Sequence, residues 1–73
     1  MSRMIDWSDV LRVTQKLGYR IINRKGSTRT FMSGQREPSI VTFHEPHNGQ
    51  VIYETRVLKR LRITQTQLAE LAQ

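Results

Sequence analysis

The sequence predicts one α+β domain over residues 1–73, with helices packed on one face of a three-stranded antiparallel sheet. Three observations lead to this fold class. An amphipathic helical pattern opens the chain, three short alternating segments with turn residues between them follow, and a second helical pattern closes it. Short connections favour an antiparallel meander, and such a sheet buries one face under helices and leaves the other exposed.

The first pattern predicts a helix over residues 6–17. Asp6 is placed to cap its N-terminus, and Gly18 is typical of a C-terminal stop. Apolar side chains recur along the segment at helical spacing, which predicts a face that packs in the core. The members of this face are Trp7, Val10, Leu11, Val13 and Leu17.

The middle of the chain predicts strands at about residues 19–25, 28–32 and 39–44, because branched and aromatic residues alternate with polar ones there. Gly26 and Ser27 favour a turn between the first two strands.

Alternation also assigns the side chains to faces. In the second strand, Arg29 and Phe31 share one side, opposite the hydroxyls of Thr28 and Thr30. The same rule places Arg20 and Arg24 of the first strand on the side of Ile22.

The C-terminal part predicts a helix that begins near Thr55. Thr64 and Gln67 have the spacing of a capping box, so we expect a break near Ile63 and a short last helix to about Leu71. One continuous helix is the alternative.

The charge balance predicts a polyanionic partner. Lys and Arg number 12 against 6 Asp and Glu, a formal net charge of +6, and 9 of the 12 basic residues are Arg. Arg binds phosphate in a bidentate manner, so RNA is the first candidate and an acidic protein the second. The chain has no cysteine and no apolar run long enough to cross a membrane, so we expect a cytoplasmic protein without membrane contact.

A basic turn and a basic helical surface are the expected contacts for RNA. Phosphate oxygens accept hydrogen bonds from Arg, Lys and hydroxyl groups. The expected RNA-binding residues are Arg24, Lys25, Ser27, Arg29, Arg56, Lys59 and Arg60. A solvated hairpin turn is the alternative interpretation of the residues around Gly26.

His44 and His47 are the chain's two histidines and therefore its candidates for proton transfer. An unperturbed imidazole has a pKa of about 6.5 and can act as acid or base in RNA hydrolysis. Structural roles at a strand end and in a turn are the alternative. Two histidines without cysteine make a poor metal site. Nucleotide-binding and zinc-protease motifs are absent, so we expect no metal, no cofactor and no small-molecule ligand.

Several segments together resemble the HicA toxins, which are small mRNA interferases of type II toxin–antitoxin systems. The resemblance covers nearly the whole chain, and the order and spacing of its pieces carry it. These pieces are Leu17-Gly18-Tyr19, Lys25-Gly26-Ser27, Phe31, Pro46-His47, Gly49 and the helix over residues 55–63.

The resemblance implies a double-stranded-RNA-binding-like α-β-β-β-α fold, metal-independent mRNA cleavage and neutralisation by a HicB-type antitoxin. The family motif is Gly-Ser-His followed by a hydrophobic strand, and its His is catalytic. Here the motif is Gly26-Ser27-Thr28, so Thr28 occupies the position of the catalytic His. A hydroxyl donates to a phosphate oxygen but does not exchange protons near neutral pH as imidazole does.

Three explanations of Thr28 remain open at this point. The protein is a weak or inactive relative, or it uses His44 or His47 instead, or Thr28 is a substitution that allows a toxic protein to be produced. Two alternatives to the nuclease follow: a non-catalytic RNA-binding domain of the same fold, and a basic subunit that mainly docks an acidic antitoxin.

Overall fold

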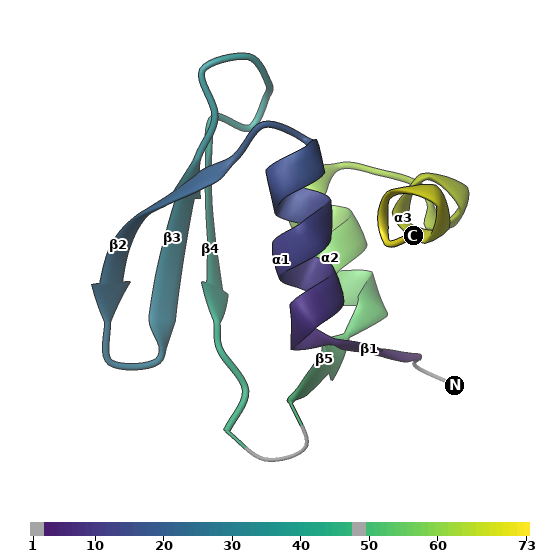
Figure 1. Ribbon diagram of the computed structural model, residues 1–73, viewed down its shortest axis with the longest axis horizontal. Coiled ribbons are helices and arrows are strands. Elements are labelled where there is room, and N and C mark those ends of the chain that lie inside the picture. The colour runs from purple at the N-terminus through teal and green to yellow at the C-terminus, as the bar shows by residue number, and fades with distance from the viewer. Residues whose placement is uncertain (1–2, 48–49) are drawn as a thin grey trace.

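A three-stranded antiparallel sheet and a helical layer organise the chain in the computed structural model, which describes residues 3–47 and 50–73. Helices α1 and α2 lie on one side of this sheet, and α3 lies beyond them, away from it (Figure 1). In chain order the elements are β1 (Met4–Asp6), α1 (Trp7–Lys16), β2 (Arg20–Lys25), β3 (Thr28–Met32), β4 (Ile40–His44), β5 (Val51–Tyr53), α2 (Glu54–Leu61) and α3 (Gln65–Leu71).

The expected α+β class and the antiparallel sheet in the order β2-β3-β4 are confirmed. The sequence did not predict β1 and β5, which pair antiparallel in a separate two-stranded sheet beneath α1 (Figure 1). Each has only three residues, shorter than the alternating runs on which strand prediction depends.

The first helix begins one residue later than expected, because Asp6 belongs to β1 and pairs with Val51. Asp6 occupies the N-cap position of α1, as expected, but its side chain makes no capping hydrogen bond. The N–H of Trp7 instead donates to the Gln50 carbonyl at 2.7 Å. The helix ends as expected, with Gly18 at a φ of 91°.

A β-bulge in β2 corrects the expected facing of its arginines. Register shifts between Ile21 and Asn23, so that Arg20 pairs with Met32 whereas Arg24 pairs with Arg29. Met32 and Arg29 project to opposite faces of β3. Arg20 and Arg24 therefore lie on opposite faces, because the extra residue interrupts the alternation.

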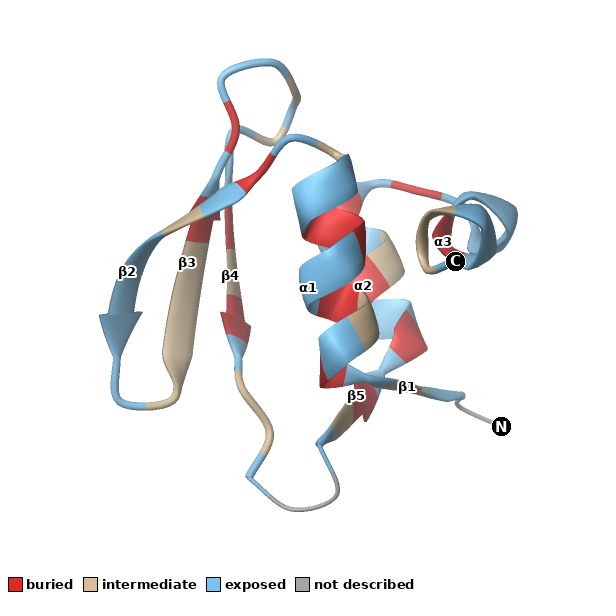
Figure 2. Cartoon of the chain, in the orientation of Figure 1, coloured by how far each residue is buried: buried red, intermediate tan, exposed pale blue. Residues whose placement is uncertain are grey.

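The two faces of the three-stranded sheet differ sharply in burial. Phe31, Val41 and Phe43 face the helices and are buried. We call the side of the sheet away from the helices the outer face. Apart from these buried residues, most of the sheet is half-buried or exposed (Figure 2). The outer face carries Lys25, Thr28, Thr30, Met32, Ile40, Thr42 and His44.

An aromatic cluster forms the centre of the core. Trp7 of α1 contacts Phe31 and Phe43 edge-to-face, with ring centroids 6.4 Å apart in both pairs, and the two Phe rings are 6.0 Å apart. Edge-to-face geometry suits the quadrupoles of the rings. Leu11, expected in the core, is instead exposed, so the buried stripe of α1 is narrower than predicted.

The break between the last two helices is confirmed, which excludes one continuous helix. Arg62 adopts a left-handed conformation with φ of 55°, and Thr64 forms the expected capping box with Gln67. The α3 helix packs against α1 and contributes Leu68 to the buried core.

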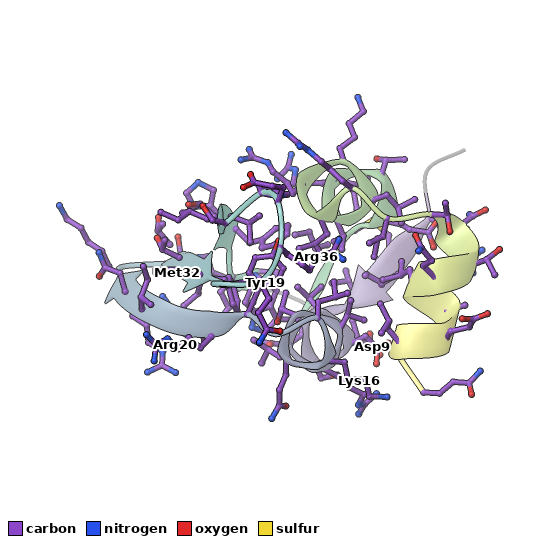
Figure 3. All side chains as sticks on the ribbon, turned by 90° about the horizontal axis from the view of Figure 1, so that it is seen from above. Asp9, Lys16, Tyr19, Arg20, Met32 and Arg36 are labelled. Carbon is purple, nitrogen blue, oxygen red and sulfur yellow. The ribbon has the colours of Figure 1, made fainter. Side chains whose placement is uncertain are left out.

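Two polar contacts attach the loop between β3 and β4 to the helical layer. Tyr19 donates its hydroxyl to the Pro38 carbonyl at 2.6 Å, and Arg36 donates to the carbonyl of Leu61 at the end of α2. Figure 3 shows Tyr19 and Arg36 between the sheet and the helices. In the described part of the chain, no helix is long and apolar enough to cross a membrane.

Candidate functional site

Thr28 and His44 lie directly opposite each other on neighbouring strands. They are register partners between β3 and β4, and Thr28 Oγ1 is 3.4 Å from His44 Nδ1. Both side chains belong to the outer face. The structure thus brings an imidazole beside the hydroxyl of Thr28, at the end of the Gly26-Ser27 turn.

This pair can hold the imidazole in both of its protonation states. When only Nδ1 carries a proton and donates to the Thr28 hydroxyl, Nε2 is free to accept a proton. When both ring nitrogens carry protons, Nδ1 still donates to the hydroxyl and the imidazolium can release the Nε2 proton. Thr28 can therefore orient His44 in both a base and an acid role.

Arg29 and Glu45 hold the turn beside this pair. The N–H of Glu45 donates to the Ser27 carbonyl at 2.7 Å, and Glu45 Oε1 lies 3.2 Å from Arg29 Nε. Arg29 Nη1 also donates to the carbonyls of Gly26 and Thr28, at 2.7 and 3.0 Å. Its side chain is only 16% exposed. These contacts give Arg29 an intramolecular role.

Gly26 permits the tight hairpin that places Thr28. The loop between β2 and β3 contains only Gly26 and Ser27, and Gly26 has a φ of 60°. Two-residue hairpin loops need a positive φ to match the twist of the strands, which glycine adopts without steric cost.

A solvent-open pocket of about 300 Å³, the histidine pocket, collects several of the expected residues. It lies between the end of β4, the turn at Ser27 and the start of α2. His44 and His47 both line it, as the short spacing between them suggested. Among its other lining residues are Ser27, Glu45, Tyr53 and Arg56.

A second, larger groove of about 440 Å³, the α2 groove, follows the exposed side of α2. Two residues, Tyr53 and Arg56, line both hollows, so the two are adjacent. The lining of the α2 groove is Tyr53, Thr55, Arg56, Lys59 and Arg60. All three cations expected on this helix therefore line one groove, which lies next to the histidine pocket.

The basic residues of β2 lie apart from this groove. Lys25 is the register partner of Thr28, so Lys25, Thr28 and His44 form a row across the outer face. Arg24 pairs with Arg29 and is on the other face. Of Arg24 and Lys25, only Lys25 therefore lies beside the Thr28–His44 pair.

Tyr53 is the residue of this region that the sequence prediction missed. It is 49% exposed and stands at the junction of the histidine pocket and the α2 groove. The signal was the run Val51-Ile52-Tyr53, which is branched and aromatic and therefore favours a strand.

Three further findings bound the interpretation. Within residues 3–47 and 50–73, no three His, Asp or Glu side chains are grouped so that they could hold a metal ion. Gly49, which contributes to the resemblance, is outside the described residues. Comparisons of the chain with protein-family models, with curated proteins and with solved structures find no match.

Proposed function

We propose that the chain is a HicA-like toxin that binds and cleaves mRNA, with His44 in the role that the family gives to the residue at position 28. The observation that carries the proposal is the Thr28–His44 pair, with Thr28 Oγ1 3.4 Å from His44 Nδ1. The α2 groove, lined by Arg56, Lys59 and Arg60 and adjacent to the histidine pocket, supports RNA as the ligand.

We assign the fold to the double-stranded-RNA-binding-like class. The order α1-β2-β3-β4-α2 supports this assignment, with β1, β5 and α3 as additions to it. The uncovered outer face and the +6 charge support a HicB-type antitoxin of acidic character as the protein partner. An mRNA target places the protein in the cytoplasm.

Cleavage proceeds through attack of a ribose 2′-OH on the adjacent phosphorus. His44 takes the 2′-OH proton as the O–P bond forms, and His47 protonates the departing 5′ oxygen as its bond to phosphorus breaks. The products are a 2′,3′-cyclic phosphate and a 5′-hydroxyl, so no external reactant is consumed. The hydroxyl of Thr28 orients His44, and Lys25 beside it supplies positive charge for the phosphate.

Cleavage of a labelled RNA by purified variants tests this assignment. His44→Gln and His47→Gln should each slow cleavage by about 10²–10⁴-fold, as expected for the loss of a general acid or base. Arg20→Gln is the control, because Arg20 is exposed and lines a different pocket. This variant should cleave RNA at the rate of the parent protein. Full activity in His44→Gln would contradict the role of His44.

A non-catalytic RNA-binding domain is the second candidate, and the length of the Thr28–His44 contact favours it. At 3.4 Å this contact is long for a hydrogen bond. Salt-sensitive RNA binding without cleavage by the parent, and with cleavage restored by Thr28→His, would select this alternative.

A further inference from the structure

Tyr53 has the position of a platform rather than of a core residue. It is the last residue of β5 and is 49% exposed, whereas its neighbours Ile52 and Glu54 are buried. It lines both the histidine pocket and the α2 groove. An exposed aromatic ring at the junction of a cationic groove and a pair of histidines is not explained by packing.

The backbone around Tyr53 is held on both sides, so the ring stands on a rigid element. Tyr53 pairs with Met4 of β1, and Ile52 pairs with Ile5. The N–H of Glu54 donates to the Arg3 carbonyl at 2.9 Å, which extends the contact between these segments by one hydrogen bond. Because the backbone at Tyr53 is already ordered, only the rotamers of its side chain lose conformational entropy when a ligand stacks on the ring.

We propose that Tyr53 stacks on an unpaired nucleobase and that the ligand of the two adjacent hollows is single-stranded RNA. This inference rests on the proposed function and specifies its substrate class. Arg56, Lys59 and Arg60 are three and four residues apart on one side of α2, so they follow the backbone of a strand whose base covers Tyr53.

Duplex RNA does not fit this arrangement as well. Bases in a duplex are already stacked on their neighbours, and a protein reaches mainly the backbone and the 2′-hydroxyls in the shallow groove. The π-face of Tyr53 has no partner in such a complex. Single-stranded RNA offers both a free base for the ring and a phosphate chain for the cations.

Direct binding of a short oligonucleotide tests the inference. The probe is a fluorescent 12-nucleotide 2′-O-methyl RNA of mixed sequence, which has no free 2′-OH within the chain to cleave, used alone and annealed to its complement. The parent protein should bind the single strand at least tenfold more tightly. Tyr53→Ile, which keeps strand propensity without the ring, should weaken single-strand binding by about 5- to 150-fold, since stacking on one base contributes about 1–3 kcal/mol.

Three controls separate the ring from general effects. Tyr53→Phe keeps the ring and should retain most of the single-strand affinity. Ile40→Ala removes an equally exposed apolar side chain from the outer face, outside both hollows, and should leave binding unchanged. Lys59→Gln should reduce the slope of log affinity against log salt by about 0.7 for the single strand.

The outcomes distinguish this inference from the proposed function. Equal binding of single strand and duplex, or unchanged binding in Tyr53→Ile, overturns the stacking role and leaves RNA as the ligand. Failure of the parent to bind either probe at low salt overturns the stacking role and the proposed function together. Urea midpoints followed by Trp7 fluorescence confirm that each variant is folded.

Discussion

Arg29 was expected to bind RNA, but its contacts predict that it stabilises the fold through Glu45. The two charges lie 3.2 Å apart, a distance at which unit charges attract by about 5 kcal/mol in an effective dielectric of about 20. Glu45 is 37% exposed, and burial of the Arg29 charge has a desolvation cost. Both effects reduce the net value, so we expect a coupling free energy of about 1 kcal/mol.

A double-mutant cycle isolates this coupling. Arg29→Met and Glu45→Gln keep much of the volume of each side chain while removing its charge. Glu45→Gln should lower the free energy of unfolding by about 1 kcal/mol through loss of the ion pair. Arg29→Met should lower it by about 1–2 kcal/mol, because it also removes the hydrogen bonds to the Gly26 and Thr28 carbonyls. The double variant should lose less than the sum of the two, by about 1 kcal/mol.

Urea denaturation is the assay, and Trp7 is its probe. It is the only tryptophan and is 4% exposed in the core, so its fluorescence should change on unfolding. A coupling below about 0.3 kcal/mol would refute the stabilising role of the ion pair. If Arg29→Met then also weakened RNA binding while stability stayed the same, Arg29 would be an RNA ligand as the sequence suggested.

Three further predictions concern elements that position the site, each measured as a urea midpoint by Trp7 fluorescence. Gly26→Ala should cost about 1–2 kcal/mol through its φ of 60° alone, because no atom lies within 4 Å of the added Cβ; Gly26→Asn should cost less. Thr64→Ala should cost about 1 kcal/mol by removing the capping box of α3, and Thr64→Ser should retain most of it. Phe43→Ala should cost about 3–5 kcal/mol, a large part of the stability of a small domain, because Phe43 is fully buried against Trp7 and Phe31. Equal midpoints for variant and parent would contradict each of these expectations.

Local chemistry predicted much of the fold correctly. The Gly18 stop, the Gly26-Ser27 turn and the Thr64 cap each depend on neighbouring residues only, and each is present in the structure. The strand Thr28–Met32 has the predicted limits, since its alternation is regular. The features that the sequence did not predict depend on contacts between segments far apart in the chain. Strands β1 and β5 pair although 44 or more residues separate the paired positions, and neither strand is long enough to be recognised alone.

The sequence predicted which types of residue form the candidate site better than it predicted which of them lie together. Arg56, Lys59 and Arg60 were expected on one helix surface and do line one groove. The expected shared face of Arg20 and Arg24 was undone by the bulge between Ile21 and Asn23, because a single extra residue exchanges the faces. Tyr53 was missed because its exposure depends on the pairing of β5 with β1.

By itself, the sequence determined the α+β class, the tight basic turn and the excess of arginine. Only the tertiary structure decided what stands opposite Thr28. The residues 28 and 44 are 16 positions apart, and the register of β3 against β4 brings His44 Nδ1 within 3.4 Å of the Thr28 hydroxyl. Cross-strand register depends on the packing of Phe31, Val41 and Phe43 under the helices, which local sequence patterns do not specify.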